Sequence, residues 1–295
     1  MALIKKVNKA KTRTFGRTHS FYEPNKDLKE GFWGMWKIMV RELVDSAGLG
    51  WRLFLRDFSA KYRQSSLGYL WTIIIPAITV LTFIFLNKSE ILNVGEVDIP
   101  YPVFALFGIT IWGIIQETVV GISMVLNVSV GLVRKISFPK ISLVYSPVLI
   151  SIVNFFIKIV LVIGLSIYYK VIPSINAFYF PILILPIFFI SIGLGFYFAI
   201  VGAIFKDIGN YLLVLFQILM LVTPVLYSIP DVAFFQVINQ INPFFYLIYT
   251  MRDLVFTGSF SFSLGYIISA LVSILFLLTG WRFYHVATAR IVEKV

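Results

Sequence analysis

Long apolar runs, separated by short polar or basic segments, fill most of this chain after residue 66. A helix needs about 20 apolar residues to cross the hydrocarbon core of a membrane, and six runs approach or exceed that length. Pro76 lies inside the first run, Glu117 interrupts the second, and Lys158 lies within the third. The pattern predicts membrane spans at 67–86, 102–133, 141–169, 178–205, 211–229 and 262–284.

The segment before the first span has the period of an amphipathic helix. Apolar residues recur at three- and four-residue steps, and charged residues fall between them. A basic amphipathic helix with tryptophans on its apolar side tends to lie in the membrane interface. Packing against the rest of the protein is the other interpretation. The apolar positions are Phe32, Met35, Trp36, Met39, Leu43, Ala47, Trp51, Phe54, Leu55, Phe58 and Tyr62.

The stretch between the fifth and sixth spans is apolar but broken by Asn239, Asn242-Pro243, Arg252-Asp253 and Gly258. Each piece is too short to span, so we expect short helices that dip into the outer leaflet, where protein or water must cover irregular backbone. The predicted fold is therefore an all-α integral membrane protein. Six transmembrane helices follow a cytoplasmic amphipathic interface helix, and short re-entrant helices lie on the outward side between spans five and six.

The distribution of Lys and Arg predicts the orientation of these spans. Segments on the side of the N-terminus hold 21 basic residues, against 3 on the other side. Basic residues accumulate in cytoplasmic loops, so both chain ends are expected in the cytoplasm. The predicted organisation is a mobile basic cytoplasmic tail (1–30), an amphipathic interfacial region (31–66), a transmembrane domain (67–285) and a cytoplasmic C-terminal tail (286–295).

Composition limits the chemistry. Hydrophobic residues make up 59% of the chain and charged residues 13%, against about a quarter in soluble domains. The chain has no cysteine, so disulfides and thiolate metal sites are excluded, and its two histidines, His19 and His285, do not suggest a metal site. The polar, basic beginning does not fit a cleaved signal peptide. The net charge of +11 fits anionic membrane lipids, and no nucleic acid is expected as a partner.

Three blocks of sequence resemble one family. The first is Arg56 to Trp71 with Pro76, and the second is the loop Gly131 to Lys140. The third runs from Lys206-Asp207 through Thr223–Tyr227 to Ile241–Pro243. In this order and spacing they resemble the ABC-2-type polysaccharide export permeases, which are the transmembrane subunits of O-antigen, capsule and teichoic-acid exporters. The resemblance covers about residues 30–285.

The resemblance implies a function. The chain would be the non-catalytic permease subunit of an ATP-driven exporter that moves a lipid-linked bacterial polysaccharide, with O-antigen as the expected cargo. It would be a multi-pass protein of the bacterial cytoplasmic (inner) membrane, and a homodimer would form the channel. Its partners would be a second copy, two copies of an ABC ATPase, a polyprenyl-pyrophosphate-linked polysaccharide and membrane lipids.

No cofactor is expected on this chain. No Gly-Lys dipeptide occurs, so the phosphate-binding loop of ATPases is absent, and ATP and Mg²⁺ would be held by the partner subunit. Export of capsule or teichoic acid is the nearest alternative. A proton-coupled secondary transporter would need Glu117 to titrate, and no inverted repeat supports it. A membrane glycosyltransferase would usually need clustered acidic residues, and no Asp-x-Asp occurs.

Two groups of residues are candidates for function on the inner side. The short basic loop between spans two and three is the expected ATPase-coupling segment, although a simple positive anchor is the other interpretation. A basic group below the first span is expected to guide a lipid pyrophosphate, to bind anionic lipid or to contact the ATPase. The coupling residues are Arg134, Lys135, Ile136, Ser137, Phe138, Pro139 and Lys140, and the basic group is Arg52, Arg56, Lys61 and Arg63.

Further candidates lie within the spans. Aromatic rings can stack on sugars, so Tyr69, Trp71, Trp112 and Tyr227 are candidate channel-lining residues, although lipid-facing or interfacial positions are the commoner use of such residues. Charged groups in a span are functional hypotheses by default. Glu117 and Lys158 are expected to pair, to line a hydrated channel, or to lie at a shallower level. The small residues Gly193, Gly195, Ala199 and Gly202–Ala203 are a possible close-packing surface in a dimer.

Overall fold

A computed structural model of the chain describes residues 32–63, 67–89, 95, 97–228 and 233–292. All regular structure among these residues is helical, which confirms the predicted all-α class. Four helical segments are long and apolar enough to cross a membrane: Tyr101–Ser123, Lys140–Tyr168, Ile175–Ile204 and Ser263–Arg290. Two shorter apolar helices are Trp71–Leu86 and Ile208–Val222. The predicted tail, 1–30, lies outside the described residues.

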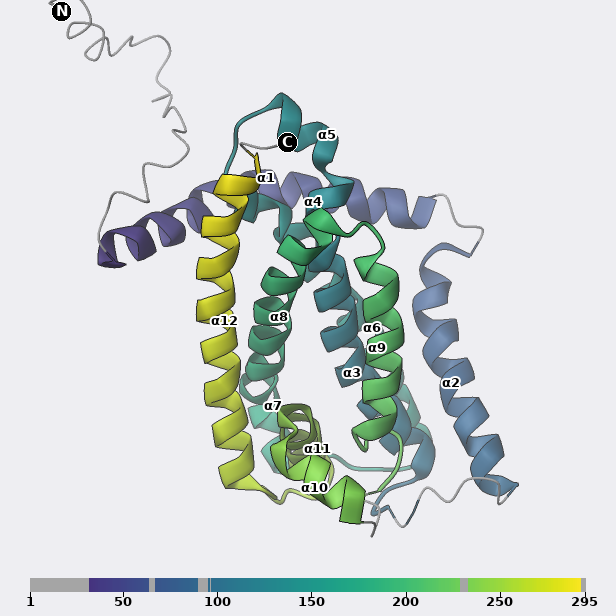
Figure 1. Ribbon diagram of the computed structural model, residues 1–295. Coiled ribbons are helices and arrows are strands. Elements are labelled where there is room, and N and C mark those ends of the chain that lie inside the picture. The colour runs from purple at the N-terminus through teal and green to yellow at the C-terminus, as the bar shows by residue number, and fades with distance from the viewer. Residues whose placement is uncertain (1–31, 64–66, 90–94, 96, 229–232, 293–295) are drawn as a thin grey trace, which may run out of the picture.

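The long helices run side by side along one direction and form a bundle (Figure 1). α3 is its central member, because it packs against α2, α6, α8 and α9. The apolar segment of α3 is accordingly 72% buried, whereas that of α12 is only 22% buried. The bundle helices are α2 (Trp71–Lys88), α3 (Tyr101–Ser123), α6 (Tyr145–Tyr168), α8 (Leu185–Ile204), α9 (Ile208–Val222) and α12 (Ser263–Val292).

One long amphipathic helix, α1 (Phe32–Arg63), crosses one end of the bundle nearly at right angles to the other helices (Figure 1). One of its faces is buried against α6 and the 3₁₀ turn η4 (Lys140–Leu143). A second apolar stripe at helical spacing stays exposed, and the amphipathic pattern therefore serves both protein packing and an outward apolar surface. The stripe comprises Trp33, Val40, Val44, Trp51 and Leu55.

Short helices complete the two ends of the bundle. α4 (Val125–Val128) and α5 (Val130–Lys135) follow α3 and protrude beyond α1, whereas α10 (Ala233–Ile241) and α11 (Pro243–Phe256) lie at the opposite end (Figure 1). The remaining turns are η3 (Gly68–Leu70), η5 (Ile175–Tyr179) and α7 (Phe180–Leu183). Because α9 ends at Val222, the fifth apolar run is not one helix to residue 229 as predicted.

The small residues of α8 form contacts inside the chain. A Cβ atom at Gly193 would lie 2.5 Å from the backbone carbon of Phe276 in α12, and one at Gly280 would lie 2.5 Å from the Gly193 oxygen. Gly202 similarly lies against the backbone of Ser123, the last residue of α3. The close packing expected from these residues therefore joins α8 to α12 and α3, and these glycines do not present a free surface to a second copy.

Candidate functional site

The loop that follows α5 is divided between exposed and buried residues. Lys135, Ile136 and Ser137 are exposed, and Ile136 keeps 48% of its surface accessible. Phe138 is buried with Leu53 and Tyr284, and its ring lies 4.1 Å from the ammonium nitrogen of Lys140. Phe138 to Lys140 therefore anchor the loop, and the outward surface available to a partner lies just before them. Of the predicted coupling residues, the side chain of Arg134 lies outside the described part of the structure, and Pro139 is half-buried.

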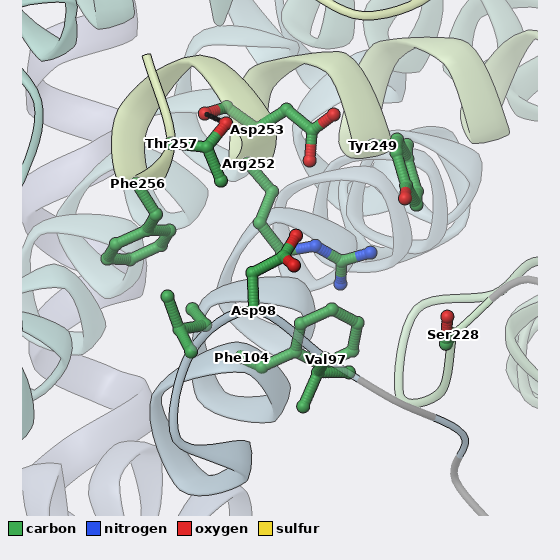
Figure 2. Close-up of a pocket in the computed structure, with 10 residues that line it drawn as sticks. Val97, Asp98, Phe104, Ser228, Tyr249, Arg252, Asp253, Phe256 and Thr257 are labelled. Atoms are coloured by element: carbon green, nitrogen blue, oxygen red, sulfur yellow. Dashed lines mark hydrogen bonds between the residues drawn. The ribbon is translucent and has the colours of Figure 1, made fainter. Parts of the chain in front are cut away.

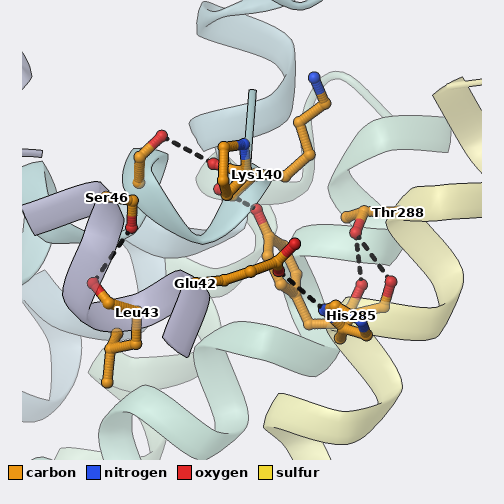
Figure 3. Close-up of polar contacts among 9 residues, drawn as sticks. Glu42, Leu43, Ser46, Lys140, His285 and Thr288 are labelled. Carbon is orange, nitrogen blue, oxygen red and sulfur yellow. Dashed lines mark hydrogen bonds and ion pairs between the residues drawn. The ribbon is translucent and has the colours of Figure 1, made fainter. Parts of the chain in front are cut away.

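Polar contacts fix α1 to the base of the bundle beside this loop (Figure 3). The hydroxyl group of Tyr145 in α6 donates to the Leu43 carbonyl at 2.5 Å. Nδ1 of His285 in α12 lies 3.4 Å from a Glu42 carboxylate oxygen, and the Tyr284 hydroxyl donates to the Lys140 carbonyl at 3.1 Å. The loop, α1 and α12 are thus connected directly, so a displacement of the loop would be passed to both helices.

The predicted basic group lies partly around a pocket between α1 and the ends of α3 and α6 that lie nearest to it. The pocket has a volume of about 390 Å³, and both Arg56 and Lys61 line it. Asp57 organises this site, because it accepts hydrogen bonds from Arg56 at 2.8 Å and from Ser146 of α6 at 2.7 Å. Arg52 is exposed on α1 and does not line the pocket, and the side chain of Arg63 lies outside the described residues.

The two predicted intramembrane charges pair across α3 and α6. Lys158 Nζ lies 2.5 Å from Glu117 Oε1, and Asn154 donates to Glu117 Oε2 at 2.5 Å. A Cβ atom at Gly113 would lie 2.6 Å from the Lys158 nitrogen, so glycine at this position leaves room for the ammonium group. Thr118 and Ser151 add a hydroxyl pair at 2.9 Å between the same two helices. Of the three expected arrangements, the structure adopts the ion pair.

Asn154 was not among the predicted site residues. It lies one helical turn before Lys158 on α6, and residues four apart share a helix face. The Asn154 amide could therefore have been inferred from the position of Lys158, once α6 was known to pack against α3. The Glu117 side chain keeps 29% of its surface exposed, against 8% for Lys158.

The predicted channel-lining aromatics occupy different environments. Trp112 is 1% exposed and lies edge-on to Phe216 and Phe244, so it is a core residue of the single chain and does not line a channel. Trp71 is 44% exposed at the start of α2. Tyr227 lies in the turn after α9, where its hydroxyl group donates to the Leu221 carbonyl. The side chain of Tyr69 lies outside the described residues.

The later parts of the third sequence block, Thr223–Tyr227 and Ile241–Pro243, form one connected unit at the end of the bundle opposite α1, whereas Lys206-Asp207 joins α8 to α9 at the α1 end (Figure 1). Asn242 is the N-cap of α11, where its side chain accepts from the Phe244 amide at 3.0 Å. Its amide group donates to Thr223 at 2.8 Å, and the Tyr101 hydroxyl of α3 donates to the Leu226 carbonyl at 2.9 Å. Residues 223–228 are therefore held in a defined non-helical turn between α3 and α11.

A buried arginine joins the same turn to α11 (Figure 2). The Arg252 guanidinium lies 3.5 Å from the centre of the Phe104 ring, and Nη1 donates to the Val225 carbonyl at 3.2 Å. Nη2 has no hydrogen-bond partner among the described residues. Arg252 also lines a cavity of about 30 Å³ together with Asp98 and Asp253. Burial lowers the pKa of Arg252 to about 10, so this side chain remains charged at neutral pH, and burial raises the pKa of Asp253.

These features define a class of protein. A helical bundle carries several membrane-capable helices, an amphipathic helix across one end, a protruding basic loop beside it and short broken helices at the other end. This arrangement is that of a multi-pass helical membrane protein.

Comparison with known proteins gives the family. The sequence profile of the ABC-2 type transporter family matches residues 49–256, and the chain belongs to this family. It is 28% identical to the O-antigen export system permease protein RfbA of Myxococcus xanthus over 209 residues, which are 70% of this chain and 79% of that protein. It is 24% identical to the protein of the same name from Klebsiella pneumoniae over 212 residues, which are 70% of this chain and 80% of that protein. The resemblance inferred from the three sequence blocks is thereby confirmed.

Proposed function

We propose that this chain is the permease subunit of an ABC exporter that moves a lipid-linked bacterial polysaccharide across the cytoplasmic membrane, with O-antigen as the cargo. The observation that carries the proposal is the similarity to O-antigen export permeases over 70% of the chain. Capsule and teichoic-acid export remain alternatives within the family, because the described residues do not specify a particular sugar.

The proposed topology has six spans with both termini in the cytoplasm. α2 and α9 supply the two spans beyond the four long ones, although α9 has only 15 residues and so extends about 22 Å. A helix this short leaves the turn at 223–228 at membrane depth, where irregular backbone is tolerated only against protein or water. The contacts of this turn with α3 and α11 supply that protein cover. The exposed apolar face of α9, which includes Val214, Ile218 and Leu221, is proposed to lie beside a second copy of the chain and the channel between the two copies.

The ATPase partner is proposed to dock on the protruding loop. Lys135, Ile136 and Ser137 are exposed there, and Phe138 fixes the loop to the bundle. Two ATPase subunits, which would bind ATP and Mg²⁺, would act on the two copies of the loop. The contacts from this loop to α1 and α12 provide the path along which a movement would reach the spans.

The pyrophosphate of the carrier lipid is proposed to enter at the pocket beside Arg56 and Lys61. Arg56, Lys61, the Asp57 carboxylate and the hydroxyl groups of Ser129 and Ser146 line a volume of about 390 Å³ under α1, and the remaining walls are apolar. A bound pyrophosphate would compete with Asp57 for Arg56. Arginine and lysine are the usual partners of phosphate groups. Because Arg56 is held by Asp57 at 2.8 Å, its guanidinium is already oriented along the rim.

A proton-coupled secondary transporter is the second candidate function. It requires Glu117 to gain and lose a proton during transport. The Glu117 carboxylate is held by two fixed partners on α6, the Lys158 ammonium and the Asn154 amide. The ion pair therefore supports a structural role between α3 and α6 over proton coupling.

The decisive experiment is co-purification of this chain with its ATPase, followed by ATPase and export assays in lipid vesicles. A complex with two copies of each subunit, stimulated by a lipid-linked polysaccharide, is the expected result. A chain that purifies without an ATPase, and whose transport follows a proton gradient, would contradict the proposal. Export of teichoic-acid or capsule precursors in place of O-antigen would retain the class and correct the cargo.

A further inference from the structure

A second pocket lies under α1, on the other side of the inner end of α6. It has a volume of about 330 Å³ and lies between α1, α6, α8 and α12. Its walls include Leu43, Val148, Leu149, Ile192, Phe196 and Trp281. None of the candidate functional residues lines this pocket.

The lining of the pocket excludes a polar occupant. Among the side chains that line it, only Tyr145 and Trp281 carry a polar atom, and the Tyr145 hydroxyl already donates to the Leu43 carbonyl at 2.5 Å. A buried water needs two to four polar partners, which this wall does not offer. An empty space of this size would deprive its lining of the contacts that keep protein interiors close-packed. The occupant is therefore hydrocarbon.

The position of the pocket indicates which hydrocarbon fills it. The pocket lies directly below α1, and Trp281 at its edge meets Trp36 of α1 edge-on at 5.8 Å, as expected for a tryptophan pair at the membrane interface. The adjoining surface of α12 exposes Leu271, Ile274 and Leu278 to the surrounding lipid. α2 and α9 lie toward the opposite side of the bundle (Figure 1), so the proposed second copy does not cover this pocket.

We propose that this pocket binds an acyl chain of a phospholipid from the leaflet in which α1 lies. The chain enters from the exposed side of α12 and ends against Val148 and Ile192. Lys140, next to the lining residue Ile141, provides a positive charge on the headgroup side.

The bound chain also has a mechanical consequence, which rests on the proposed function. The pocket lies inside the set of contacts that joins α1, the coupling loop and α12. These are the Tyr145–Leu43 hydrogen bond, the Glu42–His285 pair (Figure 3) and the Tyr284–Lys140 hydrogen bond. A filled pocket makes this junction close-packed, so that a displacement of the loop moves α8 and α12 together. An empty pocket lets the loop move without them.

Lipid binding is tested on the full chain with a phospholipid that carries a photoreactive diazirine at mid-chain. After illumination in membranes, peptide mass spectrometry should find crosslinks to α6 around Val148 and to α8 around Ile192. Crosslinks confined to the exposed surface residues of α9 and α12 would overturn the proposal. This measurement uses the native sequence, so it does not depend on a variant that folds.

A pair of matched variants tests the pocket itself. Val148→Phe places a ring in the pocket, whereas Val160→Phe makes the same change on the lipid-exposed side of α6, where Val160 is 65% exposed. Native mass spectrometry should show a retained phospholipid in the wild type and Val160→Phe, and its loss in Val148→Phe. Equal retention in all three would refute the site, and a retained mass equal to the polyprenyl carrier would refute the phospholipid assignment.

The mechanical consequence has its own readout. In complexes with the ATPase, Val148→Phe should keep ATP hydrolysis while export falls, and Val160→Phe should keep both. Loss of the lipid with unchanged export would refute the mechanical role alone. Failure of the proposed function would appear differently, as the absence of an ATPase complex in the wild type.

Discussion

At the scale of single residues, the buried charge of Arg252 and the partly buried charge of Glu117 are satisfied by neighbours from other elements of the fold. Glu117 has two partners on α6, and Arg252 has a carbonyl and an aromatic ring. Unpaired charges in such surroundings are costly, so each partner removed should weaken the fold even where it plays no part in transport.

Glu117→Gln should destabilise the chain, because the buried Lys158 side chain would lose its carboxylate partner. Removing one member of a fully buried pair costs about 3–5 kcal/mol, and the cost here should be smaller because Glu117 is 29% exposed. Thermal unfolding in detergent measures the change. The double variant Glu117→Leu with Lys158→Met should recover most of the loss. A fully stable Glu117→Gln protein that has lost only transport would instead favour the proton-coupled alternative.

Arg252→Ala should loosen α11 from the end of α3 that lies farthest from α1. The change removes the contact with the Phe104 ring and the hydrogen bond to the Val225 carbonyl, which together correspond to about 2–4 kcal/mol. Hydrogen exchange of residues 223–228 and 243–256 should increase, while exchange in α1 should not change. Arg252→Lys keeps the charge but not the planar stacking, so it should give an intermediate result.

At the scale of elements, close helix packing depends on where glycines meet backbone. Gly193 and Gly280 allow the backbones of α8 and α12 to approach closely. Among the described helices, α8 and α12 form the most extensive helix–helix contact. Gly193 and the other small residues of α8 had suggested a dimer surface from their spacing alone. Spacing shows that a face permits close approach, but the partner of that face depends on the tertiary arrangement.

Gly193→Ala should separate α8 from α12 and lower stability by about 1–3 kcal/mol, because its Cβ would lie 2.5 Å from the Phe276 backbone. Gly164→Ala is the matched control, since nothing lies within 4 Å of a Cβ at that position in α6. The control should be neutral or stabilising by up to about 1 kcal/mol, through its higher helix propensity. Equal effects of the two variants on thermal unfolding would contradict this packing.

The loop after α5 has two parts with different expected phenotypes. Ile136→Asp changes an exposed residue, so the chain should fold normally but lose its ATPase in a co-purification assay. Phe138→Ala removes a buried ring and should cost roughly 3–5 kcal/mol of folding free energy. If Ile136→Asp retained the ATPase, the exposed part of the loop would not be the docking surface.

At the scale of the whole molecule, the two ends of the bundle have distinct characters. One end carries α1 and the basic loop, and the other carries α10, α11 and the turn at 223–228 (Figure 1). The proposed orientation places the first end in the cytoplasm, in agreement with the excess of Lys and Arg on that side.

Cysteine labelling tests this orientation directly, because the chain contains no cysteine of its own. Ser259→Cys, in the exposed loop after α11, should react with a membrane-impermeant maleimide in intact spheroplasts. Ser137→Cys, in the exposed loop after α5, should react only after the membrane is opened. The reverse labelling pattern would invert the topology.

The sequence alone determined the class of fold, because apolar length and the asymmetry of Lys and Arg reflect the membrane as a solvent. It also indicated the short helices near Asn242-Pro243, since helix-breaking residues were frequent there. The presence of Glu117 and Lys158 in apolar runs was likewise visible from sequence, and it marked them as residues that need a partner.

Only the tertiary structure decided which partner each of these residues meets. In the structure, Trp112 and Phe138 lie in the core. Gly193 of α8 packs against α12, and Asn154 donates a hydrogen bond to Glu117. A one-dimensional pattern shows which face of a helix is apolar or small. In a membrane protein that face can meet lipid, another helix or a second copy, and all three are apolar, so only the three-dimensional packing distinguishes them.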